Sequence, residues 1–420
     1  TEQVSDLMKL AWREEIPVVP RGMASGLAAA SVPLDGGLVL DTCRMNRIIE
    51  IDEVNFTATV QAGVITQTLA DTVAKKGLFY PPDPSSIKQS TLGGNAACNA
   101  GGPRCLKYGV TSDYVMGLTV VLADGRLLKT GGKAIKNVTG YNLTQLFVGS
   151  EGTLGVITEL VLKLVPLPEV ARTAKAIFPK LVDASNCVNA ILAAGITPAT
   201  IELMDETTIS TIEEAMHLNL PLDVEAMLLI EADGMDEEAV IKEIETIATI
   251  CRASGAREVE VARTEQERAK LWTARRSISP SLARRAPNKL GEDISVPRSA
   301  IPDAVAAIKE ISKKHDIPIA IFGHAGDGNL HPNILFDKRD PAQVEKMKKA
   351  AGDIFAVSVQ LGGTLSGEHG VGNLKMPFLE QDIGPIFIDV MASIKQALDP
   401  KNILNPGKVV PSAGTKALLS

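Results

Sequence analysis

The stretch IAIFGHAGDGNLHPN, residues 319–333, combines an apolar run, a glycine-rich turn and two histidines. Its pair Asp327-Gly328 is a strong signal for a two-residue hairpin loop, because a type I′ turn needs positive φ at both central residues. With the turn at that pair, His324 stands directly opposite His331, and opposed residues share one face with Cβ atoms roughly 5 Å apart. Imidazole is the commonest metal ligand in proteins. The stretch therefore predicts a hairpin that carries a two-histidine clamp.

A carboxylate that would complete such a clamp lies farther along the chain. His369 follows Glu368 in the glycine-flanked sequence GEHG, residues 367–370. Two imidazoles and one carboxylate leave positions open on a divalent ion, which is the pattern of catalytic rather than structural metal sites. Spacing alone does not separate this interpretation from a surface hairpin whose histidines are polar turn residues.

Length and composition narrow the class of protein. A chain of 420 residues predicts two or more domains. A net charge of −7 with scattered basic residues argues against nucleic acid as a partner. We find no signal peptide and no apolar run near the roughly 18 residues of a membrane span. Five cysteines without metal-site spacing indicate reduced thiols in a cytoplasmic protein.

The first part of the chain alternates short predicted strands with loops of small residues. These loops are PRGMASGL (20–27), a run dense in turn formers (81–109) and GSEGTLG (149–155). We expect 81–109 to be structureless, and a loop of that length is usually functional. Small residues allow the backbone to approach a phosphorylated ligand closely. Because neither GxGxxG after a strand nor GxxxxGK[ST] is present, the loops alone leave open a choice between plain turns and a nucleotide site.

The second part follows a strand–helix–strand rhythm that is typical of an α+β, ferredoxin-like domain. The expected strands are 226–231, 257–261 and 317–322, and the expected helices are 236–254, 300–314 and 341–361. A last helix is predicted at 384–398, and we expect the tail from Pro411 to be loose. Because Thr1 starts a predicted helix without an initiator Met, we expect that upstream residues, including an N-terminal strand, are missing.

Eight motifs occur in an order that resembles a known family. They are PRGMASGL, PPDP, TLGGNAACNAGG, KYG, TGYNLTQLFVGSEGTLGVIT, GHAGDGNLHP, GEHGVG and LNPGK. Together they resemble the FAD-linked D-2-hydroxy acid dehydrogenases, which include the glycolate oxidase catalytic subunit and D-lactate dehydrogenases. The resemblance implies an α+β fold with a PCMH-type (vanillyl-alcohol-oxidase-like) FAD-binding domain at 1–165. A substrate (cap) domain with a metal site would follow at 166–380, and a C-terminal helical segment at 381–420 would return to the flavin.

The resemblance also implies where FAD is held. Relatives with covalent FAD use a histidine in the first domain, whereas the first histidine here is His217, so we expect non-covalent FAD. The residues implied around the cofactor are Arg21, Gly22, Ser25, Gly26, Leu27, Pro82, Asp83, Ser90, Thr91, Gly93, Gly94, Asn95, Asn99, Gly101, Gly102, Glu151, Gly152, Gly155, Ile157 and Asn405.

Two positions depart from the family pattern. Ala24 stands where relatives commonly have glycine, and its methyl group is expected to strain or shift the phosphate loop. Relatives that use larger diacids place a lysine shortly before the counterpart of residues 293–295. Here Gly291 stands at that place and Lys289 lies two residues away, which disfavours a dicarboxylate substrate.

The chemistry that the resemblance implies uses the histidine clamp. His324, His331 and Glu368 would bind a divalent metal, Zn²⁺ or Fe²⁺ with Mn²⁺ as an alternative. His369 would act as general base, and the alternative for it is a third imidazole ligand or a buried structural histidine. Arg275 would bind the substrate carboxylate, since a guanidinium offers a bidentate fork.

The implied reaction is oxidation of a small D-2-hydroxy acid, D-lactate before glycolate, with hydride transfer to flavin N5. Since the chain has no iron–sulfur spacing and no NAD motif, electrons would leave to an external acceptor. Candidates are an electron-transfer flavoprotein, in a complex that couples lactate oxidation to NAD and ferredoxin, and an iron–sulfur subunit. The non-enzymatic alternative is a flavin-binding structural subunit.

Overall fold

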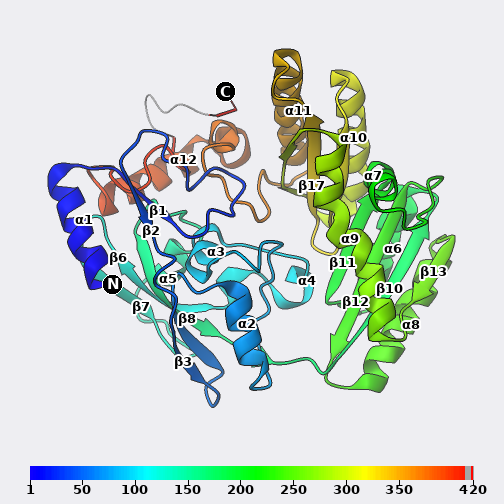
Figure 1. Cartoon of the computed structure of the whole chain (residues 1–420), viewed down its shortest axis with the longest axis horizontal. Helices are drawn as coiled ribbons and strands as arrows, with labels where there is room; N and C mark the ends of the chain where they lie inside the picture. The colour runs from blue at the N-terminus through cyan, green and yellow to red at the C-terminus, as the bar shows by residue number, and fades with distance from the viewer. Residues whose placement is uncertain (412–417, 420) are drawn as a thin grey trace. The chain divides into compact units, whose positions relative to one another are not determined.

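The computed structural model describes residues 1–411, 418 and 419 and contains two compact units (Figure 1). The first unit comprises Thr1–Gly102, Tyr108–Leu167 and Glu368–Ser420, and the second comprises Pro103–Lys107 and Pro168–Gly367. The chain thus returns to the first unit at Glu368, earlier than the predicted C-terminal segment at 381. Most of the tail after Pro411 lies outside the described residues.

The first unit is built on a five-stranded sheet in the order β3-β4-β8-β6-β7, in which every neighbouring pair is antiparallel. Two small pairs, β1-β2 and β5-β9, accompany it. The strands are β1 (Val18–Arg21), β2 (Leu38–Asp41), β3 (Ile48–Asp52), β4 (Thr57–Gln61), β5 (Leu78–Phe79), β6 (Val115–Val121), β7 (Leu127–Gly131), β8 (Val156–Lys163) and β9 (Val165–Pro166). Alternate residues of β4, β6 and β8 form its main apolar core with Leu69, Val73 and Phe147.

The helices of this unit include short ones that the sequence did not predict. They are α1 (Glu2–Glu14), α2 (Thr66–Ala74), α3 (Leu92–Cys98), α5 (Leu143–Phe147) and α12 (Leu379–Leu398), and α4 (Cys105–Tyr108) lies at the boundary between the units. The prediction of a structureless run at 81–109 was wrong, because α3 and α4 lie within it. The Thr91 hydroxyl caps α3 by accepting a hydrogen bond from the Gly94 N–H at 3.2 Å, so the cap signal outweighs the two glycines.

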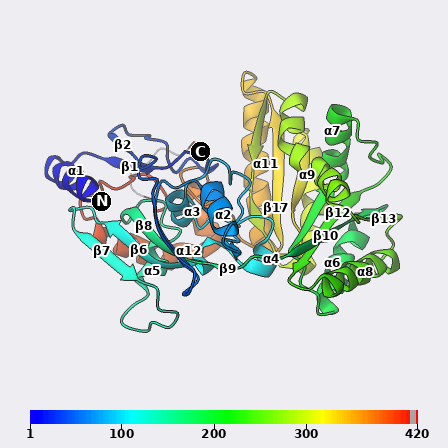
Figure 2. The same cartoon turned by 60° about the horizontal axis from the view of Figure 1, so that its bottom comes forward.

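The second unit is an eight-stranded antiparallel sheet in the order β13-β10-β12-β11-β16-β17-β14, with β15 also paired to β17 (Figure 2). Its strands are β10 (Val170–Phe178), β11 (Thr200–Asp205), β12 (Ala226–Gly234), β13 (Glu258–Val261), β14 (Asn288–Gly291), β15 (Ile294–Ser295), β16 (Ile319–His324) and β17 (Asn329–Phe336). Its helices are α6 (Leu181–Ala193), α7 (Glu206–Met216), α8 (Glu237–Ala253), α9 (Glu265–Arg285), α10 (Ile301–His315) and α11 (Pro341–Gln360).

One face of this sheet carries both an apolar core and the buried polar residues of interest. Ile209 and Ile212 of α7 pack with Leu271, Ile278 and Leu282 of α9 over alternate residues of β10, β11, β12, β16 and β17. Side chains of a strand alternate between the two faces of a sheet. On β11, Glu202 therefore lies on the same face as Met204, under α9. On β12, Glu231 likewise lies on the same face as Leu229.

The β16–β17 hairpin exists, but its predicted register was wrong. His324 pairs with Asn329, and His331 pairs with Phe322, so the connection has four residues, 325–328. Only Gly328 has positive φ, at 86°, and the His324 carbonyl accepts from both Asp327 N–H (3.3 Å) and Gly328 N–H (3.1 Å). A slip of two residues keeps every side chain on its face, whereas a slip of one would reverse it. The two histidines therefore remain on one face as diagonal neighbours.

Among the described residues, no helix combines the length and the apolar character needed to cross a lipid bilayer.

Candidate functional site

The two histidines of the hairpin converge inside the second unit. Their Nε2 atoms are 3.4 Å apart, their rings meet nearly edge to face at 84°, and the side chains are about 5% exposed. Two nitrogen ligands at about 2.05 Å from a tetrahedral ion would be separated by about 3.3 Å. The pair thus fits a divalent metal ion without rearrangement.

A carboxylate lies behind each histidine. Glu202 Oε1 bonds to His324 Nδ1, and Asp293 Oδ1 lies 3.7 Å from His331 Nδ1. The Glu202 bond at Nδ1 fixes the tautomer of His324 and leaves its Nε2 lone pair for a metal. Glu202 stands directly opposite His324 in the β11–β16 pair, and both carboxylates are fully buried.

Glu202 and Asp293 were not predicted from the sequence. The available signal was a pair of acidic residues, Glu202 and Asp205, within an apolar strand, ATIELMD at 199–205, because a buried carboxylate needs a partner. Finding that partner requires the pairing of β11 with β16, which joins residues more than a hundred positions apart.

Arg275 shares the Glu202 carboxylate. Its Nε donates to Glu202 Oε2, and its guanidinium lies over the Phe322 ring, 5.0 Å from the centroid. In the described part of the chain, its two Nη groups have no hydrogen-bond partner. Arg276 differs, because its side chain points to solvent and donates to the Ala269 carbonyl at 2.7 Å. Arg275 is therefore the arginine with a free edge beside the histidine pair.

The charged neighbours decide the protonation of Glu202. Burial raises the pKa of this carboxyl group, but the Arg275 charge and the hydrogen bonds from His324 and Arg275 outweigh burial and lower the pKa to about 2. Glu202 is therefore ionised at neutral pH and acts only as an acceptor.

Two polar side chains hold the Asp293 carboxylate in place. Asn329 Nδ2 donates to Asp293 Oδ1 at 2.6 Å, and Ser366 Oγ donates to Asp293 Oδ2 at 2.9 Å. A Cβ on Gly367 would lie 2.3 Å from Asn329 Nδ2, so only glycine allows this chain segment to pack there. Glu368 is the next residue, and with His369 it begins the last segment of the first unit.

Within the first unit, Glu151 fixes the turn that follows His369. Its carboxylate accepts hydrogen bonds from Val371 N–H at 2.7 Å and Gly372 N–H at 2.9 Å. Burial raises the pKa of Glu151 to about 7, although these donors oppose that shift. The Glu151 carbonyl accepts from Asn405 Nδ2 at 2.7 Å. The side chains of Glu151 and Asn405 thus connect the GSEGTLG, GEHGVG and LNPGK motifs to one another.

Several other residues expected around FAD have side chains engaged inside the first unit. Ser90 and Asn95 bond to Thr66, Asn99 accepts from the Ser112 N–H, and Ile157 belongs to the main core. The Arg21 guanidinium pairs with Asp41 at 3.3 Å. If these residues contact the cofactor, most would do so through the backbone.

The small residues of the loops divide into two groups. A Cβ on Gly22, Gly93, Gly102 or Gly155 would come within 2.6 Å of another protein atom, so packing within the unit already requires these glycines. A Cβ on Gly26 would meet nothing within 4 Å, which leaves its backbone open to a ligand. The remaining expected positions, Ser25, Leu27, Pro82, Asp83, Thr91, Gly94, Gly101 and Gly152, lie in the same loops or at the start of α3.

Two observations on this unit bear on an anionic cofactor. Ala24 adopts a φ of 53°, so the loop uses a left-handed conformation that glycine would adopt more easily. Lys408, in the LNPGK motif, is 2% exposed, and its Nζ has no hydrogen-bond partner among the described residues. Burial lowers the pKa of Lys408, whereas Asp35 and Glu151 raise it. A buried ammonium without a partner fits a phosphorylated cofactor, and the sequence analysis did not assign this lysine.

Comparisons with known proteins match two domain families along the chain. Residues 167–409 match the C-terminal domain of FAD-linked oxidases, and residues 1–131 match an FAD-binding domain. A Bacillus subtilis (strain 168) protein named glycolate oxidase subunit GlcD is 49% identical over 420 residues, covering 100% of this chain and 89% of that protein. An Archaeoglobus fulgidus protein named D-lactate dehydrogenase is 37% identical over 412 residues, covering 98% and 89%.

A solved structure shows the same fold at low identity. A substrate-bound p-cresol methylhydroxylase superimposes with a TM-score of 0.80 at 18% identity, covering 97% of this chain and 86% of that one. This neighbour supports the predicted PCMH-type α+β fold. The family matches confirm the resemblance that the motifs indicated. The chain therefore belongs to the FAD-linked oxidases and is an FAD-dependent oxidoreductase.

Proposed function

We propose that the protein oxidises a small D-2-hydroxy acid, D-lactate first, to the 2-oxo acid with the help of a divalent metal ion. The observation that carries this proposal is the His324–His331 pair, with Nε2 atoms 3.4 Å apart and Arg275 joined to it through Glu202. The names of the relatives, glycolate oxidase subunit and D-lactate dehydrogenase, support the substrate class. FAD supplies the hydride acceptor at its N5 atom.

The metal ligands would be His324, His331 and Glu368. Glu368 follows Gly367, which packs against Asn329, and adjacent Cα atoms are about 3.8 Å apart. The covalent chain therefore keeps this carboxylate close to the hairpin. Zn²⁺ and Fe²⁺ suit two imidazoles and a carboxylate, and Mn²⁺ is a further candidate. Such an ion would lower the pKa of the substrate hydroxyl group, as it lowers that of bound water.

Arg275 would hold the substrate carboxylate. Its Nε is fixed by Glu202 and its plane by Phe322, so the two Nη groups present a pre-oriented edge. A guanidinium edge forms two parallel hydrogen bonds with a carboxylate, and a lysine cannot reproduce this geometry. This arrangement would orient the hydroxy acid before reaction.

His369 would take the proton of the hydroxyl group. Imidazole is the usual general base near neutral pH. Glu151 fixes the backbone at Val371 and Gly372, two and three residues after this histidine, so the ring is carried by an anchored turn. The side chain is 18% exposed, which leaves it a route for releasing the proton.

A direct test is anaerobic reduction of the bound flavin. We expect D-lactate to bleach the flavin absorbance and L-lactate to leave it unchanged, in a sample whose metal content is measured. His369→Ala should lower kcat by about a hundredfold or more while the metal content stays the same. Failure of every hydroxy acid to reduce the flavin would refute the proposal. Acid precipitation tests non-covalent FAD, because flavin that stays in the pellet contradicts it.

Glycolate is the second candidate substrate. The relative that is 49% identical carries the name glycolate oxidase subunit, which favours it. The position of the lysine that relatives use for diacids is Gly291, opposite Asn333, and Lys289 donates to Ser279 at 2.8 Å instead. This difference supports a small acid. The ratio of kcat/KM for D-lactate and glycolate decides between the two.

The electron acceptor would lie on a partner, either an electron-transfer flavoprotein or an iron–sulfur subunit. The word subunit in the name of the 49% identical relative supports a partner, and the five cysteines are free thiols. Free thiols also suit a cytoplasmic location. Purification of the complex from its source, followed by analysis for iron and for a second flavin, distinguishes the two acceptors.

A further inference from the structure

We infer that Glu202 is a positioning residue whose single carboxylate locks the metal-binding imidazole of His324 and the substrate-binding guanidinium of Arg275 into one arrangement. The inference rests on the proposed function, because it deepens the roles given there to His324 and Arg275. It adds a residue that touches neither metal nor substrate, and it predicts that metal affinity and substrate affinity change together.

The geometry gives each carboxylate oxygen one task. Glu202 is 0% exposed at the middle of the sheet face under α9, and His324 stands opposite it on the neighbouring strand. Oε1 bonds to His324 Nδ1, and Oε2 accepts from Arg275 Nε. No other hydrogen bond to this carboxylate is found in the described part of the chain. Both partners are therefore held by the same rigid group.

Each contact sets a property that the proposed site needs. A proton on His324 Nδ1, held by Glu202, leaves the Nε2 lone pair directed at His331, 3.4 Å away. The bond to Nε fixes the guanidinium plane so that its Nη edge faces away from Glu202. Moving the carboxylate would disturb both groups at once.

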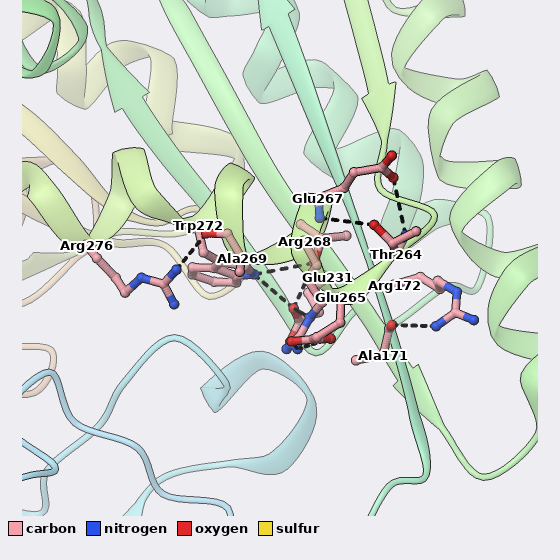
Figure 3. Close-up of polar contacts among 11 residues, drawn as sticks. Ala171, Arg172, Glu231, Thr264, Glu265, Glu267, Arg268, Ala269, Trp272 and Arg276 are labelled. Carbon is pink, nitrogen blue, oxygen red and sulfur yellow. Dashed lines mark hydrogen bonds and ion pairs between the residues drawn. The ribbon is translucent and has the colours of Figure 1, made fainter. Parts of the chain in front are cut away.

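A neighbouring carboxylate provides a matched control (Figure 3). Glu231 on β12 is also buried and also binds an arginine of α9, since it accepts from Arg268 Nε at 2.8 Å and Nη2 at 3.0 Å. It accepts further from Trp272 Nε1 at 2.9 Å and Thr173 Oγ1 at 2.8 Å. None of these partners belongs to the histidine pair, so Glu231 anchors α9 without reaching the proposed site.

The substitution Glu202→Gln tests the inference because an amide has one acceptor oxygen. Facing two donors, the amide keeps one contact and places its NH₂ group against the other donor. Glu231→Gln makes the same chemical change at the control position. Both variants lose a charge and a buried contact, but only one of them touches His324 and Arg275.

The experiment titrates Zn²⁺ or Mn²⁺ alone into the chelator-treated, flavin-loaded protein by calorimetry and then measures KM and kcat. We expect Glu202→Gln to raise the metal Kd by about 10- to 100-fold and the KM for D-lactate by about tenfold. Glu231→Gln should leave the metal Kd and the KM within about twofold and lower the thermal midpoint instead. A Glu202→Gln metal Kd within twofold of the wild-type value overturns the inference.

The outcomes separate this inference from the proposed function. If the wild-type protein binds no metal, the proposed function fails before any variant is tested. If the wild type binds metal and Glu202→Gln binds it equally well, only the inference fails. If Glu202→Gln does not fold, ¹⁵N NMR of the wild-type histidines in the metal-free protein decides, with His324→Gln used for assignment. The inference requires the Nδ1–H tautomer at His324, and an Nε2–H tautomer overturns it.

Discussion

Two buried glutamate–arginine pairs join α9 to the sheet of the second unit, and they differ in what the arginine has left to offer. Arg268 binds Glu231 through Nε and Nη2, and its Nη1 binds Glu265 at 2.9 Å. Arg275 binds Glu202 through Nε alone. The two arginines are seven residues apart, about two helical turns, so they lie on the same side of α9.

The difference distinguishes a pair that only anchors α9 to the sheet, Glu231–Arg268, from a pair whose arginine can also bind a ligand, Glu202–Arg275. Burying two charges costs several kcal/mol per ion before their attraction is counted, and this cost is similar for both pairs. In the Glu231 pair, all three nitrogens of the Arg268 guanidinium group donate to carboxylates. At Glu202 the arginine keeps one edge free, next to two histidines whose nitrogen atoms face each other. An incompletely used arginine in a buried pair is therefore the feature that indicates a site.

The largest expected effect comes from removing each arginine. Arg268→Met leaves the Glu231 charge buried and should lower the free energy of unfolding by roughly 3–5 kcal/mol. Arg275→Met likewise leaves Glu202 buried, with its bond to His324, so it should destabilise the protein by a similar amount, but unlike Arg268→Met it should also lower kcat/KM by about a hundredfold. Denaturant unfolding and steady-state kinetics on both variants check this pair of outcomes.

The claim that the two pairs have different roles is contradicted if the two variants lose kcat/KM equally or if neither changes KM. Equal losses of kcat/KM would mean that α9 acts as one unit and that the free edge of Arg275 has no special role. Equal losses of stability with unchanged KM would make both pairs structural anchors.

A third buried carboxylate on β11 sharpens the comparison because it has no arginine. Asp205 accepts from Thr208 N–H at 2.8 Å and Ile321 N–H at 3.1 Å, and burial raises its pKa to about 6. Because the folded pKa lies above the unfolded value near 3.9, its contribution to stability is full below pH 4 and is lost as pH rises through 6. The expected loss is roughly 2–3 kcal/mol.

Asp205→Asn should remove this pH dependence, since an amide mimics the protonated acid. We expect wild type and variant to be about equally stable near pH 4 and the variant to be the more stable protein at pH 7. Denaturant unfolding of both proteins at several pH values measures the difference, in which the other titrating groups cancel. A difference that does not change with pH would show that Asp205 stays ionised throughout.

The prediction that His324 and His331 share one face of the hairpin was correct, although the predicted strand register was wrong. The Asp327-Gly328 signal shifted the predicted strand register by two residues, and an even slip leaves His324 and His331 on one face. By contrast, nothing local to residues 199–205 reveals that Glu202 meets Arg275, 73 positions away. Contacts made by strand pairing and helix packing depend on the complete fold. The contacts of Glu202 with His324 and Arg275 could therefore not be predicted from the sequence.

The loops of the first unit show the opposite case. Their glycines suggested close approach to a ligand, yet Gly22, Gly93 and Gly102 are required by packing against Thr91, Ala62 and Asp83. Composition therefore does not by itself indicate a ligand site, and the family resemblance rather than the glycines identified FAD. The short helices α3 and α4 escaped prediction because seven and four residues carry too little periodicity.

A smaller effect is expected from the aromatic residue beside each arginine. Trp272→Phe removes the indole hydrogen bond to Glu231 and should lower the free energy of unfolding by about 1–2 kcal/mol without changing KM. Phe322→Leu removes the ring under Arg275, a contact of about 0.5–2 kcal/mol, and should raise KM severalfold. An increase in KM for Trp272→Phe would contradict the separation of the two pairs.

The smallest effect is expected at the outer contact of Arg268. Glu265 is 77% exposed, and its bond to Arg268 Nη1 should contribute only about 0.2–1 kcal/mol, less at high salt. Glu265→Gln should thus shift the unfolding midpoint slightly in low salt and leave kcat/KM unchanged. The variant weakens the contact of one arginine nitrogen on α9, Arg268 Nη1, which has no histidine pair beside it. If a weakly held arginine nitrogen alone were enough to bind hydroxy acids, excess D-lactate would inhibit this variant and not the wild type. We expect equal substrate saturation curves, because a free guanidinium makes a site only where Glu202 couples it to His324.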